Sequence, residues 1–120
     1  MRRALLVALA VTLPLAMAES TSSIAAGTGK HVTVTGYSTP YYGNNYAYSP
    51  QTVTIRAGRT VHWSWSSDRR HDVTWNRSGK HSATVKNLQD YARTFKNVGT
   101  FRYHCSVHGF TGKVVVNPAS

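Results

Sequence analysis

The chain has 120 residues, enough for one domain with a single hydrophobic core and too few for two. Its 14 lysine and arginine residues outnumber its 4 acidic residues, and the resulting formal charge of +10 favours acidic partners. The basic residues are scattered along the chain, which together with the export signal described next argues against a nucleic-acid partner.

Residues 1–18 have the pattern of a secretory signal peptide. Two arginines precede an almost wholly apolar run from Ala4 to Leu15, and residues 16–18 (Ala-Met-Ala) fit a cleavage site, so cleavage is expected between Ala18 and Glu19. The run is short for a bilayer span, so we expect a periplasmic or secreted protein without a membrane span in its mature form; a retained signal anchor is the alternative. Cleavage removes two arginines and leaves 12 basic and 4 acidic residues, a charge of +8.

Residues 19–30 are rich in Ser, Thr, Ala and Gly, which predicts a flexible N-terminal segment before a domain at 31–120. Within that domain, short alternating runs rich in Val, Thr, Trp and Tyr are separated by Gly, Pro, Asn and Ser, the pattern of an all-β protein. We therefore expect about eight strands in a Greek-key β-sandwich. The predicted strands are 31–37, 51–56, 60–66, 71–76, 82–85, 91–95, 100–105 and 112–117.

Alternation along strand 60–66 assigns Val61, Trp63 and Trp65 to the core. Residues 39–48 differ, because they place four tyrosines around Gly-Asn-Asn. This composition predicts either a surface loop that offers aromatic rings to a partner or a tyrosine hairpin lying on the sandwich.

The only cysteine, Cys105, is followed three residues later by His108. A lone cysteine cannot form an intramolecular disulfide, so in an oxidising compartment it is buried and inert, joined to another chain, or bound to a metal. With His71 upstream, the chain has the thiolate and the two imidazoles of a trigonal copper site, which makes metal binding the favoured option.

Three stretches combine an early histidine with a late Cys-x-x-His between two strands: His-Asp-Val-Thr at 71–74, Gly-Thr-Phe-Arg-Tyr-His-Cys-Ser-Val-His at 99–108 and Gly-Lys-Val-Val-Val at 112–116. With them, residues 31–117 resemble the cupredoxins, the plastocyanin and amicyanin group of type 1 blue copper proteins. The resemblance implies one copper ion per chain, bound by His71, Cys105 and His108.

The resemblance also implies that Asp72 and Ser106 tie the two ligand-bearing segments together. His104 is expected to face away from the metal, because no His-x-His pair completes a second copper centre. The remaining histidines match no ligand position and are expected in solvent; they are His31, His62 and His81.

The sequence departs from the family at the axial ligand, which is usually a methionine shortly after the second histidine. Both methionines of this chain lie within residues 1–18. Counting forward from His108 places Thr111 at the axial position, whereas counting back from the Gly-x-Val-x-Val strand places Phe110 there. Thr111 would offer a weak oxygen, and Phe110 would leave the copper three-coordinate with the Arg70 carbonyl opposite.

The function implied by the resemblance is one-electron transfer, not catalysis, by a monomer that docks transiently to an acidic redox protein at an apolar patch around His108. A copper storage or delivery protein is the alternative that the missing methionine favours. An enzyme or a partner-binding domain that kept the fold also stays open.

Overall fold

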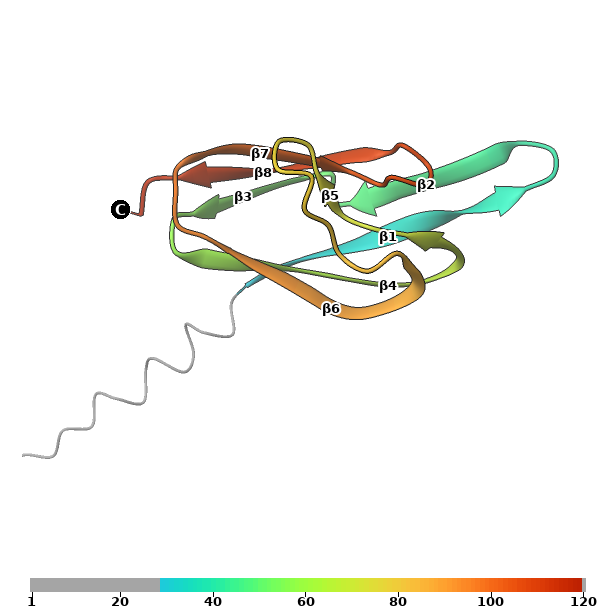
Figure 1. Cartoon of the computed structure of the whole chain (residues 1–120), viewed down its shortest axis with the longest axis horizontal. Helices are drawn as coiled ribbons and strands as arrows, with labels where there is room; N and C mark the ends of the chain where they lie inside the picture. The colour runs from blue at the N-terminus through green and yellow to red at the C-terminus, as the bar shows by residue number, and fades with distance from the viewer. Residues whose placement is uncertain (1–28, 120) are drawn as a thin grey trace, which may run out of the picture.

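The computed structural model describes residues 29–119, so the predicted signal peptide and nearly all of the segment 19–30 lie outside the described residues. Two four-stranded sheets, ordered β2-β1-β4-β6 and β3-β8-β7-β5, form the predicted all-β sandwich (Figure 1). Within residues 29–119 no helix is long and apolar enough to cross a membrane. The strands are β1 (Lys30–Thr39), β2 (Gly43–Ser49), β3 (Thr52–Arg56), β4 (Arg59–His71), β5 (Thr74–Trp75), β6 (Val85–Phe95), β7 (Gly99–His104) and β8 (Thr111–Asn117).

The strand count matches the expectation, but two predicted strands differ. The predicted strand 82–85 is wrong, because residues 82–84 lie outside the strands and only Val85 enters one, at the start of β6. The Ser82 amide donates to the Val73 carbonyl, and the Thr84 hydroxyl donates to the Asp72 carboxylate. The predicted strand 71–76 shrinks to the two residues of β5, since His71 ends the long strand β4.

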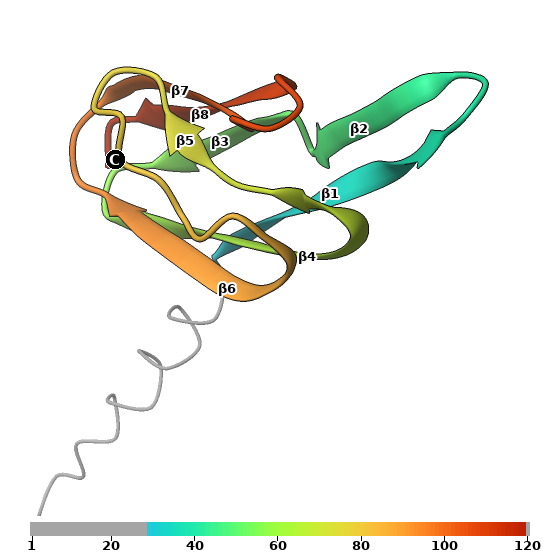
Figure 2. The same ribbon diagram turned by 45° about the vertical axis from the view of Figure 1, so that its right-hand side comes forward.

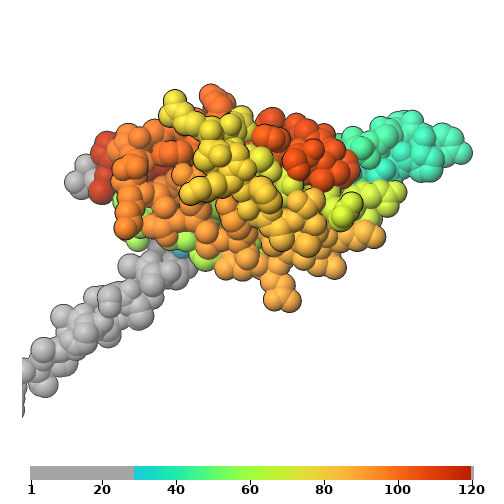
Figure 3. All heavy atoms as spheres, viewed as in Figure 1, coloured from blue at the N-terminus to red at the C-terminus, as the bar shows by residue number. Residues whose placement is uncertain are grey.

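The Tyr-rich segment forms most of a β-hairpin, because Gly43–Ser49 pairs antiparallel with β1. The far end of this hairpin projects beyond the body of the domain (Figures 2 and 3). Tyr41 and Tyr42 at its tip are 90% and 88% exposed, whereas Tyr46 and Tyr48 turn inward and are buried. The expected surface loop is thus limited to residues 40–42.

A glycine in β1 permits the close pairing of the two hairpin strands. Gly36 lies opposite Tyr46 and has a φ of 107°, a conformation that favours glycine. A Cβ at this position would lie 1.6 Å from the Asn45 carbonyl oxygen. Any other residue would therefore push β2 away from β1.

The core between the sheets is aromatic and includes the predicted Val61, Trp63 and Trp65, all of which are buried. The Trp63 ring meets those of Trp75 and Tyr103 edge to face, with centroids 5.6 and 5.5 Å apart. Such pairs contribute about 0.5–1.5 kcal/mol each beyond the area they bury. This packing fixes β4 against β7, the two strands that lead to the candidate site.

Candidate metal centre

The structure brings His71, Cys105 and His108 together, with one potential ligand atom of each lying within 4.8 Å of the others. His71 ends β4, while Cys105 and His108 belong to the connection between β7 and β8. This connection is a tight loop, in which the Gly109 amide donates to the Cys105 carbonyl and the Cys105 amide donates to the Phe110 carbonyl. The loop thereby turns the His108 ring back towards the cysteine.

One nitrogen of this cluster lacks the hydrogen-bond partner that buried polar atoms normally have. His108 Nδ1 is buried and has no hydrogen-bond partner among residues 29–119. Cys105 is fully buried, and its Sγ lies 3.9 Å from His71 Nδ1. A buried nitrogen without a partner costs about 1–3 kcal/mol unless something binds it. One thiolate and two imidazoles suit a copper ion, so the residues present fit that metal.

Hydrogen bonds around His71 indicate which of its ring nitrogens carries the proton. The Ser67 hydroxyl donates to Asp68 Oδ1 over 3.3 Å, and Ser67 Oγ lies 2.9 Å from His71 Nε2. Because a hydroxyl has one proton to give, Ser67 Oγ accepts from Nε2–H and leaves the lone pair of Nδ1 facing Sγ. Burial and the neighbouring His108 lower the pKa of His71 to about 4. The ring is therefore neutral near pH 7, as metal binding requires.

The predicted contact between Asp72 and Ser106, which ties the segment of His71 to that of Cys105, is confirmed. Asp72 is buried and accepts hydrogen bonds from the amide and the hydroxyl of Ser106 and from the hydroxyls of Thr74 and Thr84. Burial by itself raises the pKa of Asp72, but these hydrogen bonds outweigh it and hold the pKa below its usual range. The carboxylate is thus charged and fixed directly beside His71 and Cys105.

Two aromatic rings cover the histidines. The Tyr46 ring lies 4.5 Å from the His71 ring and 4.9 Å from the His108 ring, and the Phe110 ring lies 5.5 Å from that of His71. The Tyr46 hydroxyl donates to Asp68 Oδ1 over 2.7 Å. No motif in the sequence marks Tyr46 as part of the site, although its alternation with Tyr48 could have indicated an inward-facing residue.

The two candidate axial residues, Phe110 and Thr111, differ in burial and in the residues they contact. Phe110 is half-buried, with its ring packed on Tyr48 at 4.5 Å and beside His71. Thr111 begins β8 and is exposed, and its hydroxyl and carbonyl lie within 3.5 and 3.3 Å of Gln51 Nε2. Only Phe110 therefore packs against the histidines, and its side chain carries no donor atom.

The other histidines lie away from this cluster. His104 Nδ1 lies 2.6 Å from Asn76 Oδ1, which holds the ring away from the neighbouring Cys105 as expected. His31 and His81 are exposed and His62 is partly exposed. The β7–β8 loop presents apolar side chains at the surface, since Val107 is 49% exposed beside the half-buried His108 and Phe110.

A family of copper-binding proteins, the plastocyanin/azurin family, matches residues 37–117. Amicyanin of Paracoccus versutus is 35% identical over 75 residues, which are 58% of this chain and 57% of that protein. Amicyanin of Paracoccus denitrificans is 32% identical over a match with the same coverage. The chain thus spans less than two thirds of the length of these relatives.

Solved structures share the fold. The crystal structure of amicyanin from Paracoccus versutus has a TM-score of 0.57 at 26% identity, over 76% of this chain and 83% of that one. A purple cupredoxin from Nitrosopumilus maritimus has a TM-score of 0.60 at 22% identity, over 73% of this chain and 99% of that one.

Proposed function

Because the chain belongs to the plastocyanin/azurin family of copper-binding proteins, we propose that it carries single electrons between redox proteins on one type 1 copper ion. The proposed ligands are His71, Cys105 and His108. The observation that carries the proposal is the buried His108 Nδ1, which has no partner among residues 29–119, in a cluster where one potential ligand atom of each residue lies within 4.8 Å of the others.

Copper bound there supplies a one-electron couple, and a thiolate with two imidazoles accommodates both of its oxidation states. The protein's part is to keep the donor atoms in place. Asp72 holds Ser106 beside the cysteine, and Ser67 fixes the ring of His71. Tyr46 and Phe110 cover the histidine rings and keep water away from them. A rigid, dry site needs little rearrangement when its charge changes.

Electrons would enter and leave at the half-buried His108, through the apolar surface that includes Val107. The formal charge of +10 of the whole chain, or +8 after loss of residues 1–18, would attract an acidic redox partner to the protein. We propose a small, transient encounter of a monomer with that partner. The same residues 1–18 support export to the periplasm or the cell exterior.

Copper storage or delivery is a second candidate, favoured by one observation. Phe110 packs beside His71 and brings no donor atom, so copper would be held by three ligands only. A delivery protein would release Cu(I) to a chelator within minutes, whereas an electron carrier would keep it over many turnovers. No residue is proposed as catalytic.

The visible spectrum of the copper-loaded mature protein tests the main proposal. We expect a strong copper-thiolate band, which Cys105→Ser abolishes and the control His81→Gln retains. His108→Ala should lose the band and regain it when imidazole is added, because that ligand faces the surface. A band that survives in Cys105→Ser, or no band in the folded wild-type protein with bound copper, would overturn the assignment.

A further inference from the structure

A chain of hydrogen bonds connects the proposed ligand His71 to a carboxylate at the surface. His71 Nδ1 lies 3.9 Å from Cys105 Sγ, and the other ring nitrogen, Nε2, lies 2.9 Å from Ser67 Oγ. The Ser67 hydroxyl in turn donates to Asp68 Oδ1 over 3.3 Å. The donors all point the same way, from the imidazole through one hydroxyl to the carboxylate, because a hydroxyl can accept one hydrogen bond and donate another.

An irregularity at the end of β4 makes this chain possible. In a regular strand, residues four positions apart are separated by about 13 Å, too far for Ser67 to reach His71. Between its paired residues Ser66 and His71, however, β4 advances five positions while β6 advances only two, from 87 to 85. The extra residues of β4 bulge out of the pairing, and the hydroxyl is thereby brought against the imidazole.

The outer end of the chain carries a fixed negative charge. The Tyr46 hydroxyl also donates to Asp68 Oδ1, over 2.7 Å. This hydrogen bond holds the pKa of Asp68 below its usual range, so the carboxylate is charged at neutral pH. Asp68 itself is exposed, and water screens the direct effect of its charge on a distant group. The path through the half-buried Ser67 to the fully buried His71 avoids that screening.

From this arrangement we infer that Ser67 and Asp68 are positioning residues that make His71 Nδ1 a stronger donor and thereby lower the reduction potential of the copper. This inference rests on the proposed function. A partner that accepts the second N–H of a ligating histidine fixes the ring and raises the basicity of the ligating nitrogen. A more basic ligand stabilises Cu²⁺ more than Cu⁺, because the ion with the higher charge gains more from added electron density.

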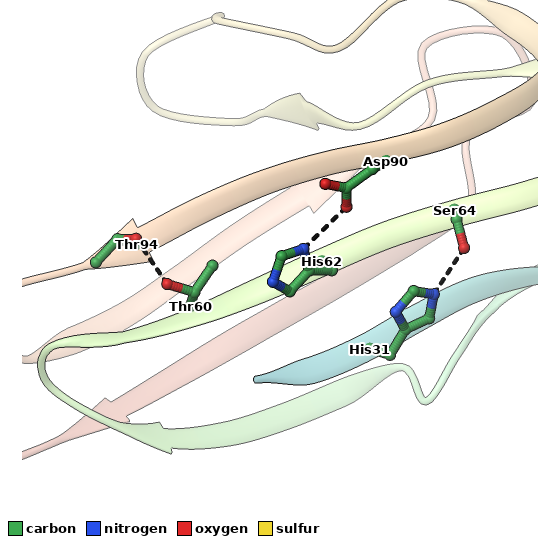
Figure 4. Close-up of polar contacts among 6 residues, drawn as sticks. All are labelled: His31, Thr60, His62, Ser64, Asp90 and Thr94. Atoms are coloured by element: carbon green, nitrogen blue, oxygen red, sulfur yellow. Dashed lines mark hydrogen bonds and ion pairs between the residues drawn. The ribbon is translucent and has the colours of Figure 1, made fainter. Parts of the chain in front are cut away.

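The outer face of the sandwich supplies matched controls, because it holds the same two kinds of contact away from the proposed ligands. Ser64, also in β4, has its Oγ 2.6 Å from His31 Nε2, and Asp90 Oδ1 lies 2.9 Å from His62 Nδ1 (Figure 4). Neither histidine is a proposed ligand. Ser64→Ala and Asp90→Asn therefore remove a serine–histidine contact and a carboxylate charge without touching the chain that leads to His71.

Voltammetry of the copper-loaded mature protein tests the effect on the potential. We expect Ser67→Ala and Asp68→Asn to raise the potential, and Ser67→Thr, which keeps the hydroxyl, to restore it. Loss of such a partner lowers metal affinity about tenfold, and a tenfold loss for Cu²⁺ alone corresponds to a rise of about 59 mV. Asp68→Asn keeps an oxygen acceptor and removes only the charge. An unchanged potential in this variant, or equal rises in Ser64→Ala and Asp90→Asn, would overturn the inference.

Imidazole ¹⁵N and ¹H NMR of the copper-free protein reads the same chain without any metal. The His71 ring should carry its proton on Nε2, and the signal of that proton should move upfield and exchange faster with water in Ser67→Ala but not in Ser64→Ala. Circular dichroism would verify the fold of each variant. A proton on Nδ1 in the wild type would overturn the chain even if copper binds. Absence of the copper-thiolate band would instead overturn the proposed function and leave the NMR result standing.

Discussion

The Asp72 carboxylate accepts hydrogen bonds from both the amide and the hydroxyl of Ser106, 34 positions later in the chain. Asp72 follows the proposed ligand His71, and Ser106 follows the proposed ligand Cys105. One buried charged group thus sets the distance between the two segments before any metal binds. The Tyr48 hydroxyl adds a further contact by donating to the carbonyl of Asp72.

Removing the carboxylate should destabilise the copper-free protein strongly. Asp72→Ala leaves the donors of Ser106, Thr74 and Thr84 without their acceptor, and we expect the free energy of unfolding to fall by about 3 kcal/mol. Ser106→Ala keeps the amide hydrogen bond and should cost about 1.5 kcal/mol. Urea unfolding of the copper-free variants measures both.

The matched control is Asp90→Ala, because the Asp90 side chain is 57% exposed and, among residues 29–119, forms an ion pair only with His62. This change should cost about 0.5 kcal/mol or less. Equal losses from Asp72→Ala and Asp90→Ala would show that the buried carboxylate does not hold the segments together.

Tyr46 should protect the site from water. Tyr46→Ala removes a buried ring that packs on both histidines, so we expect a loss of about 3–4 kcal/mol in unfolding free energy and faster removal of copper by a chelator. Tyr46→Phe keeps the ring, loses the hydrogen bond to Asp68 and should cost about 1 kcal/mol. Tyr42→Ala, at the exposed hairpin tip, is the control and should change neither quantity.

The features that could be predicted from the sequence are those set by alternation within one strand or by a short motif. The alternation of Val61, Trp63 and Trp65 was enough to assign the core, because strand residues alternate between two faces. Tyr46 could not be assigned to the site, since its position depends on how β2 pairs with β1 and on the tight approach at Gly36. The choice between Phe110 and Thr111 depended on where β8 begins, which counting along the sequence leaves open by one residue.

The same limit explains the incorrect strand at 82–85. The alternating residues 82–85 resemble a short strand. However, Ser82 hydrogen-bonds to Val73 and Thr84 to Asp72, nine and twelve positions earlier. Tertiary contacts of this kind override local propensity.

Charge steering predicts a salt-dependent reaction with an acidic redox protein. The second-order rate constant should fall tenfold or more as ionic strength rises, because screening shortens the reach of the positive surface from about 30 Å at 0.01 M to about 3 Å at 1 M. Stopped-flow mixing with an acidic electron-transfer protein measures it. A rate that stays flat across this range would rule out steering by charge.

Docking at the His108 face predicts a local effect of Val107, which is 49% exposed. Val107→Glu should slow the same reaction while the visible spectrum of the copper site stays unchanged, since the side chain is not a ligand. Val98→Glu is a matched control, because Val98 is similarly exposed at 58% and lies between β6 and β7, outside the β7–β8 loop. Equal effects of the two changes would place docking elsewhere.

The nature of residue 110 should tune the reduction potential of the bound copper. Phe110 packs beside His71 without a donor atom, so a cupric ion bound at the proposed site would lack the sulfur ligand that helps to stabilise this oxidation state. Phe110→Met supplies that sulfur at similar volume, at a stability cost below about 1.5 kcal/mol. We therefore expect the potential to fall and the visible spectrum to change. Thr111→Met should alter neither, because the exposed Thr111 side chain lies near Gln51. Voltammetry of both variants decides the point. A lower potential in Thr111→Met, or an unchanged potential in Phe110→Met, would show that the axial direction is controlled by a group other than Phe110.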